Sequence, residues 1–272
     1  MKPYWTSKDG RHVVYYGDSL VILPTIEKNS IRLLWTDPPY GHNNMNGDLQ
    51  HARVRDQVAG ARKKKSEPIK NDSHEEMRKV VSGVLDISVN LLSDESCCCC
   101  CCGGGGPEPT FAWVANRLDR EGFDFFHAVV WDKSDRGNGL GWRYRRNYEF
   151  VMVANKNGSS LSWSNKDVAI PNIIRITPPI ERVHPNEKPV GLVCEFVKVH
   201  TYDDDMVLDP FMGSGTTGVA CVRLNRRFIG IEISKEYCDI AVERIKRELS
   251  QPRLELEPQP SFEQTKLFDG LE

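Results

Sequence analysis

The segment 206–220 reads MVLDPFMGSGTTGVA and joins an apolar strand to a helix through a glycine-rich turn. The apolar run predicts the strand at Met206–Leu208, and helical spacing predicts the helix at Thr216–Leu224. Such a junction often binds a ligand, because the turn and the first turn of the helix expose backbone N–H groups. The segment therefore predicts an α/β fold with a ligand site at the end of this strand.

Three glycines and one carboxylate indicate the kind of ligand. Gly213, Gly215 and Gly218 let the backbone approach a bound group closely. Glu232 ends the next predicted strand, 19 residues after Gly213, where an acidic side chain meets ribose hydroxyls in nucleotide-binding folds. The spacing Gly-x-Gly-x-x-Gly also fits dinucleotide binding, so a nicotinamide-dependent oxidoreductase stays open at this point.

Strands and helices alternate along the rest of the chain, which favours a mostly parallel, twisted sheet with helices on both faces. Strands are predicted at 12–16, 31–36, 97–102, 125–131, 148–154, 206–208 and 228–231. Helices are predicted at 74–92, 111–120, 189–200, 216–224 and 236–249. We expect residues 1–251 to form one domain, with a polar, mobile insert at 41–72, and we expect 252–272 to be a flexible tail.

Composition excludes two classes of protein. The 272 residues carry 36 Lys and Arg against 38 Asp and Glu, and a pI near 6.4 excludes a nucleic-acid binder that works by bulk positive charge. A local basic patch would still be enough for nucleic acid. The sequence has no apolar run long enough to cross a bilayer and no secretory signal at its N-terminus, so we expect a cytoplasmic protein that does not enter a membrane.

The nine cysteines include a run of six, Cys97–Cys102. Neighbouring residues on a strand point to opposite faces, so the run cannot direct four thiolates at one metal ion. We interpret the run as small apolar side chains of a buried strand and expect no metal site. Metal binding or redox chemistry is the lesser alternative.

A second motif, Asp37-Pro38-Pro39-Tyr40, directly follows the predicted strand 31–36. This place predicts a position at the carboxyl edge of the sheet, where α/β folds bind ligands. The Asp37 carboxylate and the Pro38 carbonyl are rigid hydrogen-bond acceptors, and Tyr40 offers an aromatic face. The set suits a flat ligand with an NH2 donor, such as a nucleobase extruded from a duplex. A proline-rich turn that merely ends a strand is the alternative.

Taken together, the motifs resemble the amino-group DNA methyltransferases that use S-adenosylmethionine, in the arrangement called the β group. In that arrangement the DPPY half precedes the cofactor half, as it does here. The resemblance is carried by Gly17-Asp18-Ser19, Asp37–Gly41, His184–Pro189, Asp209–Thr217, Arg227–Glu232, Glu236-Tyr237 and Ala241-x-x-Arg244. It implies a Rossmann-like methyltransferase domain that acts on double-stranded DNA.

The resemblance also implies roles for the matching residues. The catalytic residues would be Asp37, Pro38, Pro39 and Tyr40. The cofactor would be bound by Asp18, Lys188, Asp209, Phe211, Gly213, Ser214, Gly215, Thr216 and Glu232. Within this set Glu232 would bind the ribose, Asp18 would lie near the adenine, and Lys188 would lie near the cofactor carboxylate. An ordinary surface lysine is the alternative for Lys188.

The predicted target is the N6 amino group of adenine, because DPPY accompanies adenine more often than cytosine in the resembling family. The N4 amino group of cytosine is the alternative. A cytosine-C5 enzyme needs a nucleophilic cysteine after a proline in its family, and the chain has no such pair. A DNA-binding module without activity, and a methyltransferase for RNA or for a protein glutamine, are the remaining alternatives.

Two basic segments are candidates for DNA contact. The first contributes Arg53, Arg62, Lys63 and Lys64, and it would contact phosphates. The second interleaves aromatic residues with Arg143, Arg145 and Arg146, and it would also stack on bases. The alternatives are a solvated loop for the first segment and a half-buried strand edge for the second. Residues 155–183 leave little room for a large recognition insert.

The C-terminal segment contains one further motif, with Gln264, Leu267 and Phe268 at its key positions. It resembles the QxxLF peptides that bacterial polymerase accessory proteins insert into the sliding clamp. An unpacked linker ahead of two adjacent apolar residues is the physical form that such a peptide needs. The sequence leaves open whether the protein is a monomer or a dimer and whether a restriction enzyme accompanies it.

Overall fold

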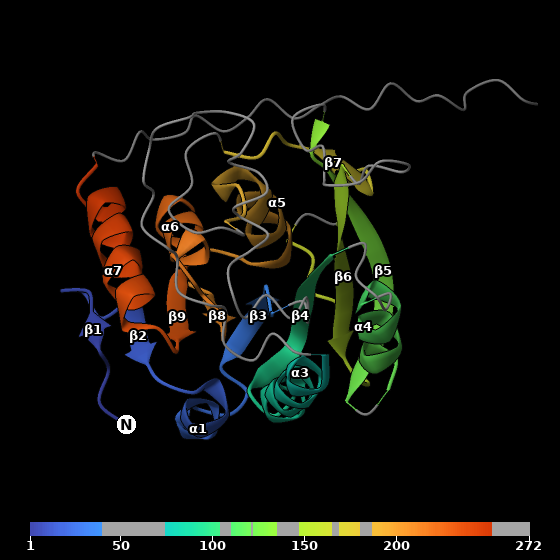
Figure 1. The fold of residues 1–272 in the computed structure, drawn as a ribbon, viewed down its shortest axis with the longest axis horizontal. Coiled ribbons are helices and arrows are strands. Elements are labelled where there is room, and N and C mark those ends of the chain that lie inside the picture. The colour runs from blue at the N-terminus through green and yellow to red at the C-terminus, as the bar shows by residue number, and fades with distance from the viewer. Residues whose placement is uncertain are drawn as a thin grey trace, which may run out of the picture.

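A nine-stranded sheet forms the centre of the fold, in the order β1-β2-β9-β8-β3-β4-β6-β5-β7 (Figure 1). The computed structural model describes residues 1–39, 74–103, 110–120, 122–134, 147–164, 169–179 and 187–251. The strands are β1 (Trp5–Thr6), β2 (His12–Tyr16), β3 (Ile31–Thr36), β4 (Leu92–Gly103), β5 (Phe123–Asp132), β6 (Tyr148–Lys156), β7 (Ile173–Arg175), β8 (Met206–Asp209) and β9 (Arg227–Glu232). The helices are α1 (Ser19–Ile22), α3 (His74–Ser88), α4 (Thr110–Leu118), α5 (Val190–His200), α6 (Thr216–Arg223) and α7 (Lys235–Leu249), with a 3-10 turn η1 at Leu23–Thr25.

Most strands of the sheet are parallel, as the alternation of strands and helices predicts. Strand β1 is antiparallel to β2, and β6 is antiparallel to both of its neighbours, β4 and β5. All other neighbouring pairs are parallel. The first residues of β6 therefore lie at the same edge of the sheet as the last residues of β3, β4, β5, β8 and β9.

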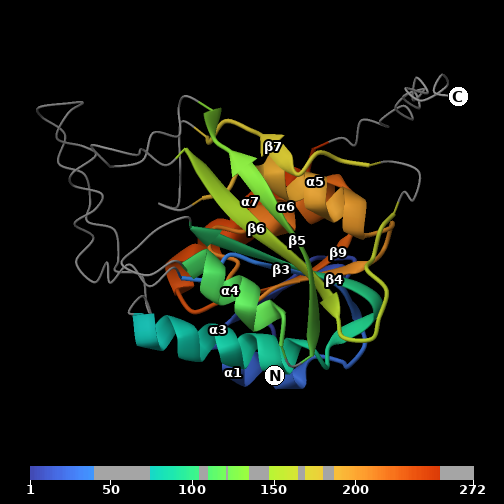
Figure 2. The ribbon, with the colours of Figure 1, turned by 90° about the vertical axis from the view of Figure 1, so that its right-hand side faces the viewer.

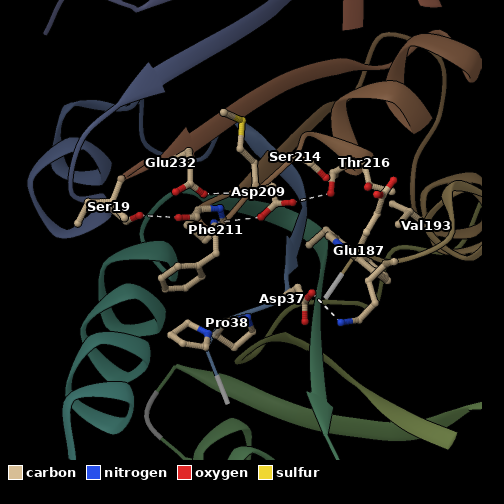
Figure 3. A pocket seen from close by; sticks show the side chains of 18 of the residues that line it. Ser19, Asp37, Pro38, Glu187, Val193, Asp209, Phe211, Ser214, Thr216 and Glu232 are labelled. Atoms are coloured by element: carbon tan, nitrogen blue, oxygen red, sulfur yellow. Dashed lines mark hydrogen bonds and ion pairs between the residues drawn. The ribbon is translucent and has the colours of Figure 1, made fainter. Parts of the chain in front are cut away.

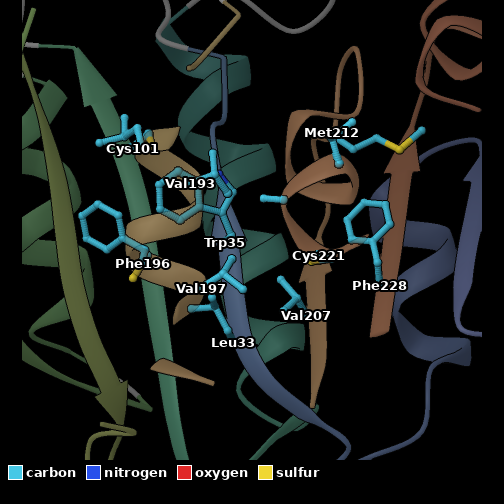
Figure 4. Packing of buried hydrophobic residues seen from close by; sticks show 14 of the residues in the cluster. Leu33, Trp35, Cys101, Val193, Phe196, Val197, Val207, Met212, Cys221 and Phe228 are labelled. Carbon is cyan, nitrogen blue, oxygen red and sulfur yellow. The ribbon is translucent and has the colours of Figure 1, made fainter. Parts of the chain in front are cut away.

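Helices cover both faces of the sheet, which confirms the predicted layers. Helices α5, α6 and α7 pack on one face, and α1, α3 and α4 pack on the other (Figure 2). Each face has its own cluster of buried apolar side chains, and Figure 4 shows the cluster beneath α5 and α6. The two clusters supply the apolar burial that stabilises the sheet.

One aromatic contact within this cluster packs helix α5 against strand β3, although the two are far apart in sequence. Trp35 on β3 and Phe196 on α5 are each 1% exposed, and their ring centroids lie 5.2 Å apart (Figure 4). Full burial of a side chain such as Phe196 contributes about 1.5–3 kcal/mol. Trp35 lies two residues before Asp37, and α5 begins two residues after Lys188, so this contact brings Asp37 and Lys188 to the same place.

The cysteine run lies on β4 and is buried, as the interpretation of a buried strand requires. Cys97, Cys99 and Cys101 belong to the cluster beneath α5, and the three cysteines between and after them belong to the cluster on the opposite face. Burial raises the pKa of all six thiols, so the uncharged thiol is their favoured form. Among the described residues, the ligand atoms of Cys97, Cys99 and His200 lie within 4.8 Å of one another, and a structural zinc site uses four ligands.

The boundary between α3 and β4 differs from the prediction. Apolar residues at helical spacing predict a helix that continues to Leu92, but the helix ends at Ser88. A turn follows, in which the Leu91 N–H donates to the Ser88 carbonyl. Leu92 then begins β4 and pairs with Ile31 of β3, so its burial belongs to the sheet and not to the helix. Periodicity alone does not separate these two uses of one apolar residue.

Several predictions fall on residues outside the described ranges and stay predictions. These are the mobile insert at 41–72, the basic residues at 53–64 and 143–146, the flexible tail at 252–272 and the clamp motif within it. Among the helices that the structure does describe, none has the length and apolar character needed to span a membrane.

Candidate active site

A pocket opens at the carboxyl edge of the sheet, where β3 and β8 lie side by side (Figure 3). The chain leads from β3 toward β4 on one side and from β8 through α6 to β9 on the other. The two connections therefore diverge, which leaves a crevice between the ends of β3 and β8. This is the place where open α/β sheets bind ligands.

The pocket brings together most of the predicted site residues. All of the predicted catalytic and cofactor residues that the structure describes line it, apart from Gly215. Asp37, Pro38 and Pro39 come from the end of β3, and Tyr40 lies outside the described residues. The remaining lining residues of the predicted set are Asp18, Lys188, Asp209, Phe211, Gly213, Ser214, Thr216 and Glu232.

The glycine turn owes its shape to two left-handed residues and to close packing. Gly213 and Gly215 have φ values of +50° and +81°, and Gly215 is the N-cap of α6. A Cβ atom on Gly215 would lie 2.7 Å from the Cβ of Ala241 on α7. Any other residue at Gly215 would therefore strain the backbone and displace α7. Gly215 thus acts through the shape of the turn rather than as part of the pocket wall.

The Glu232 carboxylate is held in place by backbone N–H groups at the end of β9. Its Oε2 accepts from the Gly213 N–H at 3.0 Å, and its Oε1 accepts from the Ser234 N–H at 2.7 Å. A carboxylate can accept several hydrogen bonds at once. The glutamate is therefore oriented before any ligand binds, and it also ties the glycine turn to β9.

Asp18 lines the pocket and also caps a helix. It is the N-cap of α1, and its Oδ1 accepts from the Leu20 N–H at 2.9 Å. The next residue, Ser19, donates its hydroxyl to the Pro210 carbonyl (Figure 3). These contacts attach the loop after β2 to the loop after β8, so that both loops face the same pocket.

Asp209 is 2% exposed and supports the glycine turn from below. The Thr217 hydroxyl donates to its Oδ2, and the Phe211 N–H donates to its Oδ1 at 3.1 Å. Burial raises the pKa of Asp209 to about 7, although both hydrogen bonds favour the carboxylate. Asp209 therefore titrates near neutral pH while it is held between two segments of the turn.

A pH-dependent effect on stability follows from this raised pKa. The folded pKa of about 7 exceeds the usual value of 3.8, so the folded state retains a proton that the unfolded chain releases. The stabilisation from Asp209 is fully present below pH 4 and is lost as pH rises through 7. Asp209→Asn lacks this pH-dependent contribution to stability, because an amide does not titrate. The amide can still accept from the Phe211 N–H and donate to the Thr217 hydroxyl oxygen.

Urea unfolding of both proteins between pH 4 and 8 measures the difference. We expect the stability of Asp209→Asn relative to the wild type to increase with pH by up to about 4 kcal/mol, and to level off above pH 7. Two stability curves that stay parallel over the whole range would show that Asp209 keeps an ordinary pKa.

Lys188 is a buried lysine that contacts the first catalytic motif. Its side chain is 6% exposed, and its Nζ donates to Asp37 Oδ2 at 2.6 Å (Figure 3). Burial disfavours the charged ammonium, but the Asp37 and Glu149 carboxylates outweigh that effect and raise the pKa of Lys188. Lys188 is therefore an ammonium ion that belongs to the pocket, and the alternative of a surface lysine is wrong.

Two acidic residues at the site had no predicted role. Glu149 Oε2 lies 3.4 Å from Lys188 Nζ, and the side chain of Glu149 is 16% exposed. Glu187 Oε1 accepts from Arg244 Nη2 at 2.6 Å, and Arg244 Nη1 also donates to the Ser214 carbonyl at 2.9 Å. The Arg244 guanidinium thus links the segment before α5 to the glycine turn.

Comparisons with known proteins identify the family. A family model described as DNA methylase, of the N6/N4 type, matches residues 31–174 and 162–243. The chain is 28% identical to the type II methyltransferase M2.DpnII of Streptococcus pneumoniae over 91% of this chain and 93% of that protein. It is 27% identical to the type II methyltransferase M2.LlaDCHI of Lactococcus lactis subsp. cremoris over 90% of this chain and 93% of that protein.

Solved structures share the fold. The complex of M1.HpyAVI with SAM, at 23% identity, matches 86% of this chain and 99% of that chain with a TM-score of 0.61. The PvuII cytosine-N4-specific DNA methyltransferase, at 21% identity, matches 89% of this chain and 88% of that chain with a TM-score of 0.66. These similarities confirm the predicted fold class. The family model, which matches most of the chain, shows that this chain belongs to the N6/N4 DNA methylase family.

Proposed function

We propose that this protein transfers the methyl group of S-adenosylmethionine to the N6 amino group of adenine in double-stranded DNA. The observation that carries the proposal is the shared pocket of Asp37 and Glu232, at the crevice between β3 and β8. One carboxylate suits an amino group of a base and the other suits a ribose. Membership of the DNA methylase family supports both assignments.

The residues of the pocket fit S-adenosylmethionine. The pocket is open to solvent and is lined by both polar and apolar side chains, which is the usual lining of a small-molecule site. Glu232 would accept from the ribose hydroxyls, and the N–H groups at the start of α6 would donate to the cofactor carboxylate. Phe211 and Met212 supply apolar wall beside these polar groups. The solved complex of the structurally similar M1.HpyAVI with SAM supports the same assignment.

The bound cofactor supplies an electrophilic methyl group on a sulfonium ion. The role of Asp37 and the Pro38 carbonyl would be to accept hydrogen bonds from the target amino group and to align its nitrogen with that methyl. In the transfer an N–C bond would replace the C–S bond, and Asp37 would accept the proton that the amino nitrogen then loses. The products are N-methyl base, S-adenosylhomocysteine and one proton.

Adenine N6 is the proposed target because the motif begins with Asp37, as it more often does in the adenine enzymes that the chain resembles. Cytosine N4 is the second candidate, because a cytosine-N4-specific enzyme shares the fold. The basic residues at 53–64 and 143–146 are proposed to contact DNA, and the tail motif is proposed to contact a sliding clamp. The similarity to type II methyltransferases supports a place beside a restriction enzyme. The protein is also proposed to act in the cytoplasm.

Mass spectrometry of nucleosides tests the proposal directly. DNA of mixed sequence is incubated with the protein and S-adenosylmethionine, digested to nucleosides and compared with a sample that lacks the cofactor. We expect N6-methyladenine to accumulate. N4-methylcytosine instead would keep the reaction and replace the target base. DNA without any methylated base, from a protein that binds the cofactor, would contradict the proposed activity.

A further inference from the structure

Four charged side chains form a chain of alternating sign that begins at the proposed catalytic carboxylate. Asp37 Oδ2 lies 2.6 Å from Lys188 Nζ, and Lys188 Nζ lies 3.4 Å from Glu149 Oε2. Glu149 Oε1 in turn accepts from the ammonium of Lys133. The side chains of the four residues are between 6% and 20% exposed, so water screens these charges weakly.

The topology of the sheet explains why residues so distant in sequence meet here. Glu149 is the second residue of β6, whose antiparallel direction brings its first residues to the carboxyl edge of the sheet. Glu149 pairs there with Gly103, the last residue of β4, and with Trp131 near the end of β5. Lys133 directly follows β5. The edge that carries Asp37 therefore also carries Glu149 and Lys133.

Two roles are conceivable for such a chain: a route for the released proton, or an electrostatic support for Asp37. Burial favours the neutral acid in Glu149, but Lys188 and Lys133 outweigh it and lower the pKa of Glu149. The pKa of Lys188 is raised. A relay would need a neutral lysine and a protonated glutamate, which is the opposite of both shifts. Glu149 and Lys188 therefore remain charged, which favours the second role, the electrostatic support of Asp37.

We propose that Glu149 is a positioning residue. Its carboxylate holds the Lys188 ammonium in place, and Lys188 in turn orients the Asp37 carboxylate and sets its electrostatic surroundings. This inference rests on the proposed function, since it assigns Asp37 to the target amino group. A long lysine side chain with one partner has several rotamers, and a second carboxylate restricts them. The second carboxylate also shares the positive charge, which leaves Asp37 a stronger hydrogen-bond acceptor than a pair with Lys188 alone would.

The first test compares two glutamates that both form ion pairs. Glu149→Gln keeps the size of the side chain and removes its charge. Glu248→Gln is the matched control, because Glu248 is 13% exposed and pairs with Arg223 on α6, outside the pocket wall. We expect Glu149→Gln to lower kcat for DNA methylation by about 10- to 100-fold, with the Kd for S-adenosylhomocysteine unchanged. The control should retain the kcat of the wild type.

The second test asks whether Glu149 acts through Lys188. Lys188→Met removes the ammonium and keeps a side chain of similar length. In that background Glu149→Gln should change kcat by less than about twofold, because the link to Asp37 is already lost. An unchanged kcat in the Glu149→Gln single variant, or an equal loss with and without Lys188, would overturn the proposal.

A third measurement needs no substrate and separates this inference from the proposed activity. Asp37→Ala and Glu149→Gln together remove both carboxylates that the structure pairs with Lys188. We expect the double variant to lose more free energy of unfolding in urea than the two single variants together, and we expect no such excess in the Lys188→Met background. If the double variant shows this excess loss of stability but the wild type makes no methylated base, only the proposed activity is contradicted. If the wild type is active, but the double variant shows no excess and Glu149→Gln leaves kcat unchanged, only the positioning role is refuted.

Discussion

Asp37→Ala is expected to lower kcat for DNA methylation by about 1000-fold or more while the affinity for S-adenosylhomocysteine stays within about threefold of the wild type. Asp37 lies at the end of β3, in the same pocket as the glycine turn, and is proposed to contact the base rather than the cofactor. Its loss removes the acceptor that would align the amino group and take its proton. The proposed cofactor contacts of Glu232 and the start of α6 do not involve Asp37, so cofactor binding should be retained while the rate falls.

Asp37→Asn divides this effect into two parts. The amide keeps one acceptor oxygen but carries no charge, so it can hold an amino group and cannot take its proton at neutral pH. We expect an intermediate rate, about 10- to 100-fold below the wild type. Quench-flow measurement of a single turnover reports the chemical step for all three proteins. Equal rates for Asp37→Ala and the wild type, with both proteins folded by circular dichroism, would remove Asp37 from the reaction.

Much of this pocket could be predicted from the sequence because its residues follow parallel strands. Asp37, Asp209 and Glu232 each end an apolar strand or directly follow one, and parallel strands bring their carboxyl ends to one edge. The glycine turn could also be predicted, because its glycines lie close together in the sequence and closely follow a strand. Local patterns thus give both the sheet and the residues at its carboxyl edge.

Glu149 could not be found in this way, because it begins a strand rather than ends one. Only the antiparallel direction of β6 and its register with β4 place it beside Lys188. Arg244 lies in the middle of α7, and its contacts to Glu187 and Ser214 depend on how that helix packs. The sequence signal that could have indicated Glu149 is a hairpin of β5 and β6, which would have predicted two strands of opposite direction at this edge.

The second large effect is expected at the cofactor end of the pocket. Glu232→Ala should weaken binding of S-adenosylhomocysteine by about 100-fold or more, because hydrogen bonds from two ribose hydroxyls to a carboxylate contribute roughly 1.5–3 kcal/mol each. Isothermal titration calorimetry measures this change without turnover. Glu236→Ala is the matched control, since Glu236 lies four residues later, in the first turn of α7, and is exposed. The control should bind as the wild type does.

Glu232 also accepts from the Gly213 and Ser234 N–H groups, so its loss could weaken binding by loosening the glycine turn instead. A 2′,3′-dideoxy analogue of S-adenosylhomocysteine separates the two causes, because it lacks the hydroxyls that the carboxylate would bind. The wild type should prefer the natural ligand strongly, and Glu232→Ala should bind both ligands with nearly the same low affinity. If the variant kept the full preference for the natural ligand, the ribose hydroxyls would have another partner, and Glu232 would serve the turn alone.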